Sequence, residues 1–335
     1  DWVFIEGGDG TAHGVMTAFL KQNPSFKTFE LKKRALDGAL YTAGLNPEIE
    51  IGLEAENFSG SKPYTAFDQS ELTVSLSSII ELGGKKEARK NLVSTKYDLV
   101  DAQRKIKSLD LISELTDSFI DALATQERIK LAEESVRLSK DIYESVKRKA
   151  EAGAISDVEV KRSFASLKHA QITLQAERSK FERQSVNLSL YWFEKEPQFN
   201  RLSGELYDFG MVKDIDLLYE DLEKSKLIQV LTIKQRLAES RLEVVQAESK
   251  ADVNWSFGVR RFDESNDAAL TAGLSIPLFK RKRNKGALIE AEAEIDTFRS
   301  EHRVALLELY GQANEFYSLR QTAITKFKSL ESEII

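Results

Sequence analysis

Apolar and polar residues alternate along four short stretches of the chain. Every second residue is apolar in "PEIEIGLEAENF", "SELTVSLSSI", "ADVNWSFGVRRF" and "ALTAGLSIPLF". A period of two predicts β-strands that each carry one apolar face. The residues predicted for these apolar faces are Ile49, Ile51, Leu53, Leu72, Val74, Leu76, Val253, Trp255, Phe257, Val259, Leu270 and Leu274.

A much longer stretch follows the helical period instead. From Lys86 to Ala152 the chain contains neither glycine nor proline and is rich in strong helix formers. Such a helix would be about 100 Å long. Steps of three and four residues mark its packing seam, and a similar stripe follows on the returning segment. The first seam is Ile129, Ala132, Val136, Ser139, Tyr143, Val146 and Ala150, beside Leu131, Leu138 and Ile142; the returning stripe is Phe164, Leu167, Leu174, Phe181, Leu188 and Trp192.

The short segment "AEAGAISDVEV" interrupts this helical pattern. Gly153 is typical of a helix C-terminus, where the backbone turns left-handed. Ser156 and Glu159 have the spacing of a capping box, so the next helix starts at once. The sequence therefore predicts a long antiparallel helical hairpin with a sharp tip. By helical pattern alone, this hairpin also fits a plain coiled-coil turn.

The order helix, strand, strand, long helix occurs twice, with an offset of about 200 residues. Two strands per repeat give four per chain, too few to close a barrel. Three chains would supply twelve strands and leave no free edge. The predicted fold class is mainly α with a small antiparallel β part, combining a helical hairpin tunnel with a trimeric 12-stranded membrane barrel.

This pattern divides the chain into six segments. They are N-terminal helices at 1–47, a first β-hairpin at 48–82, a first long helical hairpin at 83–195 with its tip at 150–157, an equatorial segment and helix at 196–251, a second β-hairpin at 252–279, and the start of a second long helix at 280–335.

Composition removes several functional classes. The net charge of −6 provides no basic footprint for nucleic acid, and the absence of cysteine excludes disulfides and thiol chemistry. His13, His169 and His302 have no partner at metal-ligand spacing, and Met16 and Met211 cannot form a thioether relay. We find no catalytic constellation and expect no enzyme activity, no cofactor and no bound metal.

One basic cluster needs a separate interpretation. Lys280, Arg281, Lys282 and Arg283 directly follow the last predicted strand. They fit a solvated turn, an anchor at the rim of the barrel, or a lining of the tunnel.

Several of these motifs resemble the outer membrane factor (TolC-like) family of efflux channels. "VSLSSIIELGGKKEAR" is similar to the strand exit of the branch that serves heavy-metal exporters of the resistance-nodulation-division type, the cobalt–zinc–cadmium branch. "LSIPLFKRKRNKGALIEAEAE" resembles the second strand exit of the family, and "RKAEAGAISDVEV" resembles its first hairpin tip. The resemblance covers nearly the whole chain.

The resemblance implies a homotrimeric, passive duct in the outer membrane, with its helical part in the periplasm. Its expected partners are outer membrane lipid, a periplasmic adaptor protein and an inner-membrane resistance-nodulation-division pump; heavy-metal cations are the expected solutes. Carried over by position, the residues that contact the adaptor are Arg148, Gly153, Ala154, Ile155, Ser156 and Asp157. The apolar strand residues named above would then face lipid.

The chain departs from the family pattern in two ways. Compared with the first repeat, the second long helix stops about 15 to 20 residues before its tip, so no gate residue can be named. Many relatives also carry a lipidated N-terminal cysteine, which this sequence lacks. Two alternative functions remain open, a periplasmic adaptor protein and a soluble coiled-coil scaffold, although neither requires the duplicated unit or strands with apolar faces.

Overall fold

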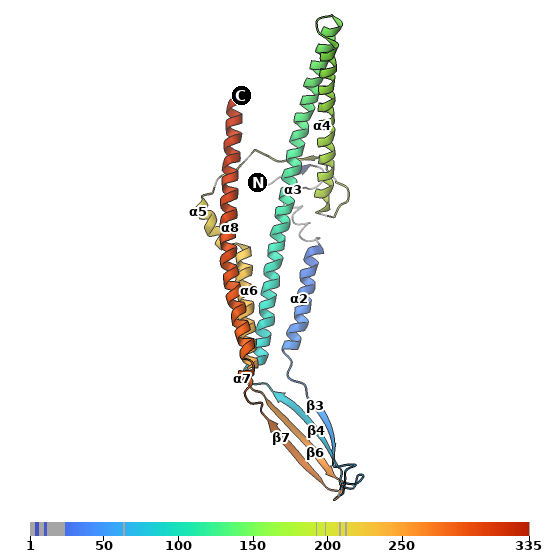
Figure 1. The fold of residues 1–335 in the computed structure, drawn as a ribbon, viewed down its shortest axis with the longest axis vertical. Coiled ribbons are helices and arrows are strands. Elements are labelled where there is room, and N and C mark those ends of the chain that lie inside the picture. The colour runs from blue at the N-terminus through green and yellow to red at the C-terminus, as the bar shows by residue number, and fades with distance from the viewer. Residues whose placement is uncertain are drawn as a thin grey trace. The chain divides into compact units, whose positions relative to one another are not determined.

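The computed structural model describes residues 4–6, 10–11, 24–62, 64–191, 193–197, 199–207, 209–211 and 213–334 (Figure 1). Our expectations for His13, Met16 and Trp192 fall outside these residues. The chain divides into two compact units. The first comprises Asp1–Phe29, Arg104–Lys213 and Thr322–Ile335, and the second comprises Glu30–Gln103 and Asp214–Gln321.

The helical hairpin dominates the first unit. Helix α3 (Lys85–Glu151) passes from the second unit into the first, and α4 (Asp157–Leu190) returns beside it. The predicted seam faces α4: Ala132 is buried and its other members are half-buried. The second stripe, Leu131, Leu138 and Ile142, is exposed in the single chain. A second neighbour for α3 therefore stays a prediction.

The sharp tip of this hairpin has a well-defined backbone cause. Gly153 has a φ of +73°, Ala154 N–H donates to the Lys149 carbonyl at 2.9 Å, and Gly153 N–H donates to the Ala150 carbonyl at 2.8 Å. These are the two hydrogen bonds of a Schellman motif, so the predicted helix stop is confirmed. The predicted capping box is wrong. Ser156 is the N-cap residue, but its side chain makes no capping hydrogen bond.

A compact apolar cluster closes the base of the hairpin. Ala122, Leu123, Leu188, Phe199 and Leu202 form it. Leu202 belongs to β5 (Arg201–Leu202), which pairs with β1 (Phe4–Glu6), and β1 pairs with β2 (Gly10–Thr11). The Gln126 side chain binds both the N–H and the carbonyl of Leu202, at 2.9 and 3.0 Å. This amide fixes the strand on α3.

The second unit combines helices with a four-stranded antiparallel sheet in the order β3-β4-β6-β7. The strands are β3 (Glu50–Glu56), β4 (Glu71–Ile80), β6 (Val253–Phe262) and β7 (Ala268–Ser275). The remaining helices are α2 (Pro24–Ala43, which begins in the first unit), α5 (Ile215–Glu223), α6 (Lys226–Glu248), α7 (Lys280–Arg283) and α8 (Lys285–Ile334).

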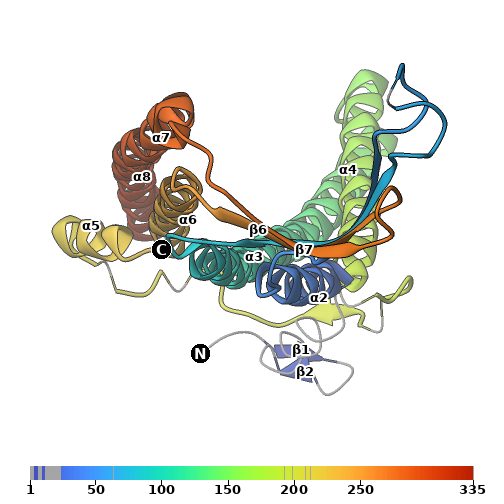
Figure 2. The same cartoon turned by 90° about the horizontal axis from the view of Figure 1, so that it is seen from below.

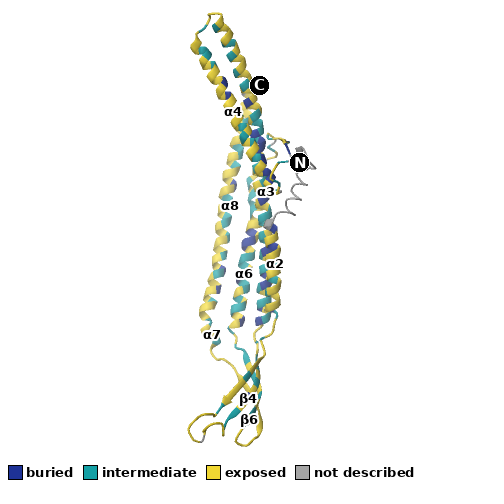
Figure 3. Cartoon of the chain, turned by 90° about the vertical axis from the view of Figure 1, so that its right-hand side faces the viewer, coloured by how far each residue is buried: buried dark blue, intermediate teal, exposed yellow. Residues whose placement is uncertain are grey.

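Helices of the second unit share a narrow interior. Buried residues come from α3 (Val93, Val100), α6 (Leu237, Ala238) and α8 (Ala291, Ile295). Polar pairs add to this packing: Thr95 lies 3.0 Å from Ser240, and Arg236 lies 3.1 Å from Asp98. Most of the remaining helix surface is exposed (Figure 3).

The predicted fold class is confirmed in its main features. The unit helix, strand, strand, long helix occurs as α2-β3-β4-α3 and again as α6-β6-β7-α8. Among the described residues, no helix combines the length and apolar character needed to cross a membrane.

Candidate functional site

The strand register places the predicted apolar residues on one face of the sheet. Directly paired residues of antiparallel strands share a face. One row across the sheet is Ile51, Leu76, Phe257 and Ala272, the next is Leu53, Val74, Val259 and Leu270, and Trp255 pairs with Leu274. This set, with its neighbours in the same alternation, is called the apolar sheet face below. Eleven of the twelve predicted residues have the register of this face, and Ile49 lies one residue before β3, outside the paired residues.

Most of these side chains are left exposed by the part of the chain that the structure describes. Leu270 is 87% exposed, Ile51 78% and Leu274 77%. Of the twelve predicted residues, only Val253 and Trp255 are half-buried. A contiguous exposed apolar surface of this kind marks a site of contact with another protein or with a membrane.

The opposite face is polar and crowded. Its rows contain Glu50 with Ser77 and Ser256, and Gly52 with Ser75, Gly258 and Thr271. A Cβ atom at Gly258 would lie 2.7 Å from the Val74 carbonyl oxygen and 2.8 Å from Thr271 Oγ1. Such crowding is expected on the concave side of a curved sheet, and Figure 2 shows the curvature.

An ion-pair network stands on this polar face near the loops that join the strands. The Arg260 guanidinium lies 2.7 Å from carboxylate oxygens of Glu56 and Glu71, and its Nε donates to Thr73 Oγ1 at 2.9 Å. On the other face Arg261 donates to the Asn266 side chain at 2.8 Å. Arg261 thus ends the apolar sheet face at its loop end.

At the opposite end of the sheet, Asp252 joins the two repeats. It accepts hydrogen bonds from Lys85, from Lys280 Nζ at 3.0 Å and from the Leu82 backbone N–H at 3.2 Å. Lys85 is only 5% exposed. Burial alone would raise the pKa of the Asp252 carboxyl, but the hydrogen bonds from both lysines outweigh burial, and the pKa lies below its ordinary value.

A second ion pair stands beside this junction. Arg89 binds both carboxylate oxygens of Glu81, at 2.6 and 2.9 Å. This bidentate hydrogen bond is the main reason that the pKa of Glu81 is lowered and the pKa of Arg89 is raised. The Glu81–Arg89 pair binds the exit of β4 to the start of α3, and the Asp252–Lys85 pair binds the start of β6 to the same helix end.

Of the six predicted tip residues, Gly153, Ala154, Ile155 and Ser156 lie in the connection between α3 and α4. Arg148 lies in the last turn of α3, and Asp157 is the first residue of α4. Gly153, Ala154, Ser156 and Asp157 are exposed, and Ile155 is half-buried. Val158, in the first turn of α4, is 65% exposed and was not predicted as part of the tip. Its position next to Asp157 was the available signal. Whether these residues contact an adaptor is considered below.

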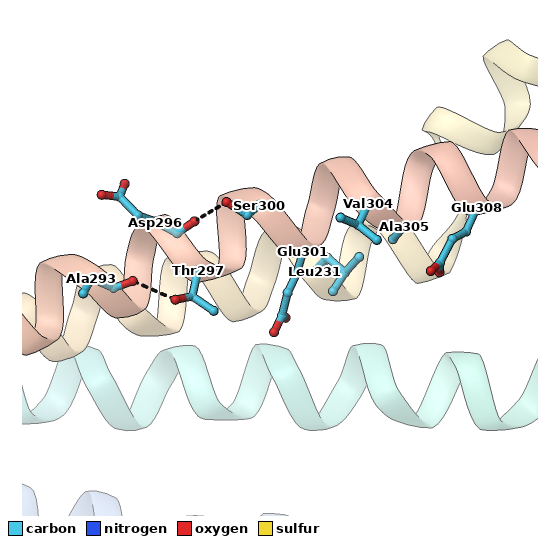
Figure 4. A pocket seen from close by; sticks show the side chains of 9 residues that line it. All are labelled: Leu231, Ala293, Asp296, Thr297, Ser300, Glu301, Val304, Ala305 and Glu308. Atoms are coloured by element: carbon cyan, nitrogen blue, oxygen red, sulfur yellow. Dashed lines mark hydrogen bonds between the residues drawn. The ribbon is translucent and has the colours of Figure 1, made fainter.

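A further hollow lies along α8. It encloses about 720 Å³, and Leu231, Asp296, Glu301, Val304 and Glu308 are among the residues that line it (Figure 4). The hollow is an open groove rather than a closed cavity, and in Figure 4 the Asp296 side chain points away from those of Glu301 and Glu308. Within the described residues, no group of three or more His, Cys, Asp or Glu side chains is arranged to hold a metal ion.

Comparison with known proteins shows which family the chain belongs to. The outer membrane efflux protein family matches residues 18–192, about half of the sequence. The chain belongs to the outer membrane efflux protein family.

Two curated relatives are the cobalt-zinc-cadmium resistance protein CzcC of Cupriavidus metallidurans and the nickel-cobalt-cadmium resistance protein NccC of Alcaligenes xylosoxydans xylosoxydans. CzcC is 27% identical over 67% of this chain and NccC is 26% identical over 80%. The chain spans only 53% and 62% of these relatives' own lengths.

Solved structures of outer membrane proteins share the fold. The outer membrane protein VceC of Vibrio cholerae matches with a TM-score of 0.70 and 15% identity, over 96% of this chain and 81% of that one. The channel protein CusC matches with a TM-score of 0.66 and 13% identity, over 99% of this chain and 78% of that one. The resemblance noted in the sequence, to efflux channels of the heavy-metal branch, is therefore confirmed.

Two parts of the site were missed by sequence reasoning. The Asp252 junction joins residues 167 positions apart, and the Arg260 network joins β6 to partners 187 and 189 positions away. Arg260, Thr73 and Glu71 have the parity opposite to the apolar residues of their strands. That parity was the available signal, since it places all three on the polar face.

Proposed function

We propose that the chain is a subunit of a passive, trimeric outer membrane duct in a tripartite efflux system. Three copies would contribute four strands each to a closed 12-stranded barrel, and the helices would form a tunnel in the periplasm. An adaptor would dock at the hairpin tip, and an inner-membrane pump would supply the work. The six segments defined from the sequence describe the domain organisation of this subunit.

One observation carries this proposal: the sheet has an exposed apolar face and a polar face. In a membrane barrel, residues alternate between lipid and lumen along every strand. Here Leu53 and Leu270 would face lipid, while Glu54 and Arg260 would face the lumen. A periplasmic adaptor or a soluble scaffold has no use for an uncovered apolar face.

The free edges of the sheet support the trimer. Within the described residues, β3 and β7 each have one edge without a strand partner. A bilayer tolerates no unpaired edge, because each free N–H and C=O costs several kcal/mol there. Pairing β7 of one copy with β3 of the next satisfies both edges, and three copies supply the number of strands that the sequence pattern predicts.

Cations are the proposed solutes. Glu50 and Glu54 lie on the polar face in addition to the carboxylates that Arg260 neutralises. The printed names of CzcC and NccC associate those relatives with cobalt, zinc, nickel and cadmium. A lumen with excess carboxylates attracts cations weakly and lets them leave, as conduction requires.

Adjacent residues on β3 provide the test, because they lie at the same depth on opposite faces. Leu53→Arg would place a charge against lipid, and Glu54→Arg is its matched control on the polar face. We expect the parent chain and Glu54→Arg to fractionate with outer membranes and to elute from detergent as trimers. Leu53→Arg should lose most of both. Equal behaviour of the two variants, or a parent chain that is a water-soluble monomer, would overturn the proposal.

The docking of the tip has its own test. The sequence contains no cysteine, so Ala154→Cys introduces a single thiol into the tip. Cross-linking in cells through this thiol should capture the adaptor, whereas Lys168→Cys, at an exposed position along α4, should not. Equal capture by both variants would argue against docking at the tip.

A further inference from the structure

A concentrated positive charge follows the last strand of the sheet. Residues 276–285, called the second strand exit here, include five cations and no acidic residue, although the whole chain has a net charge of −6. Lys280 is engaged by Asp252. Arg281, Lys282, Arg283 and Lys285 are all exposed and form no ion pair among the described residues.

Large apolar side chains precede these cations. Ile276 is 56% exposed, Leu278 72% and Phe279 77%. Ile276 and Leu278 directly follow β7, so exposed apolar side chains continue along the chain beyond the end of the apolar sheet face. Apolar side chains and unpaired cations thus meet within a few residues.

The backbone of Phe279, the last apolar residue before the cations, has an unusual conformation. Phe279 has a φ of +62° and a ψ of +20°, a left-handed conformation that bulky residues rarely adopt. Its carbonyl accepts hydrogen bonds from the N–H groups of Lys282 and Arg283, at 3.1 and 3.2 Å. Lys280, the residue after Phe279, anchors this left-handed turn to Asp252. Residues in such sparsely populated conformations are concentrated at functional sites.

The first strand exit, residues 81–90, shows that the fold does not require this excess charge. There Lys85 is engaged by Asp252, Arg89 by Glu81 and Lys90 by Glu87. Lys86 donates to the Asn46 side chain at 3.2 Å. Each cation of the first exit has a partner within the chain. At the second exit Lys280 has a partner, but Arg281, Lys282, Arg283 and Lys285 have none among the described residues, which points to a partner outside the chain.

We propose that the second strand exit binds anionic phospholipid headgroups. Arg281, Lys282, Arg283 and Lys285 would contact the lipid phosphates, and Leu278 and Phe279 would enter the region between headgroups and acyl chains. This inference rests on the proposed function, because it takes the apolar sheet face as the lipid-facing surface. Charge complementarity and continuity with that face select an anionic membrane surface as the occupant. Aromatic and basic side chains at the border of an apolar band are typical of this interface.

The expected effect of charge can be given as a change in affinity. Each basic residue near an anionic membrane surface contributes roughly a fivefold gain in binding. Removal of three such residues should therefore weaken binding roughly 100-fold. Lys280 is excluded from the variant because it belongs to the Asp252 junction.

The experiment uses the full chain in non-ionic detergent and a fluorescent phosphatidylglycerol as the probe, with phosphatidylcholine as the zwitterionic reference. The parent chain should bind phosphatidylglycerol preferentially. The Arg281→Gln, Lys282→Gln, Arg283→Gln triple variant should lose about 100-fold in affinity. The control Lys140→Gln, Lys147→Gln, Lys149→Gln removes the same charge from exposed positions on α3 and should bind as the parent does.

A second variant tests how much the Phe279 ring contributes to lipid binding and keeps a residue that tolerates the left-handed backbone at this position. Phe279→Asn removes the ring, and asparagine accepts the left-handed conformation. We expect a loss of affinity severalfold smaller than that of the triple variant. Inorganic phosphate in a parallel titration should not displace the lipid at comparable concentrations. Displacement would assign the cations to free anions and overturn the inference.

Oligomeric state, measured on the same samples, separates the two proposals. Trimers that show no preference for phosphatidylglycerol, or equal losses in the triple variant and its control, would overturn the lipid site and leave the duct intact. A parent chain that is monomeric and soluble without detergent would overturn both.

Discussion

Two apolar regions of this protein are built in opposite ways. In the first unit, Leu188 is 2% exposed and Leu202 is 1% exposed, inside a cluster completed by the chain itself. In the second unit, Leu53 and Leu270 are 73% and 87% exposed on a regular sheet. Leucine side chains are thus buried in the cluster of the first unit and exposed on the sheet of the second unit. The described part of the chain therefore covers the cluster but leaves the sheet face uncovered, and the proposed function assigns that uncovered face to lipid.

The largest expected effect belongs to the enclosed region. Leu188→Ala removes a buried side chain from the cluster and should lower the free energy of unfolding by about 3 kcal/mol. Leu190→Ala, two residues further along α4 and 50% exposed, is the matched control and should cost well under about 1 kcal/mol. Urea unfolding in detergent measures both. Equal costs would mean that the cluster is not a core.

The next effect concerns the junction that anchors the sheet. Asp252→Asn removes the charge that Lys85 and Lys280 share and should cost about 2 kcal/mol at pH 7, as for hydrogen bonds to charged groups. The variant keeps the side chain nearly isosteric, so packing is preserved. Urea unfolding at neutral pH measures this cost.

The same junction predicts a pH dependence. The folded-state pKa values of Asp252 and Glu81 are lowered, so both carboxylates contribute stability above the ordinary carboxyl pKa. That contribution is lost as pH falls below the ordinary range and through the folded values. The stability difference between the parent chain and Asp252→Asn should therefore shrink between about pH 5 and pH 2. A difference that is constant with pH would contradict the ionised junction.

A smaller effect distinguishes the sheet in lipid from the sheet in water. Leu270→Ala should cost about 1 to 2 kcal/mol when the protein is reconstituted in bilayers, because the side chain is then removed from water. The same substitution should cost close to nothing if the sheet face stays in water, as its 87% exposure in the single chain would imply. Unfolding in lipid vesicles measures this cost. Ala272→Ser, in the same strand, controls for a small change at an exposed position.

The smallest effect is expected at the tip. Ser156→Ala should change the free energy of unfolding by less than about 0.5 kcal/mol, although loss of an N-cap usually costs about 1 kcal/mol. The reason is that the Ser156 side chain makes no capping hydrogen bond. Asp214→Ala is the comparison, since Asp214 Oδ1 accepts from the Asp216 N–H at 2.9 Å. Asp214→Ala should lower the free energy of unfolding by the usual amount for a lost N-cap, about 1 kcal/mol. A loss of that size in Ser156→Ala would support the predicted capping box.

Features with a local cause could be predicted from the sequence. The alternation from Ile49 to Ala55 determined which face of β3 is apolar, because side chains of a strand must point to alternate sides. Gly153 determined where α3 ends, because only glycine enters the left-handed region without a steric cost. The duplicated order of helices and strands followed from the same two periods.

Features that depend on contacts between distant parts of the chain could not be predicted from the sequence. Asp252 pairs with both Lys85 and Lys280, and Arg260 pairs with Glu56 and Glu71. Leu202 shares a cluster with Leu188 and is hydrogen-bonded to Gln126. Such pairs depend on strand register and helix packing, and no local period encodes them. The failed capping box is a similar case at short range, since the Glu159 side chain binds Arg162 rather than the Ser156 backbone N–H. The helices, the strands and their apolar faces could thus be derived from periodicity, which is a local property of the chain. Which charges form ion pairs and which apolar surface remains uncovered became evident from the folded chain, because both depend on how distant segments come together.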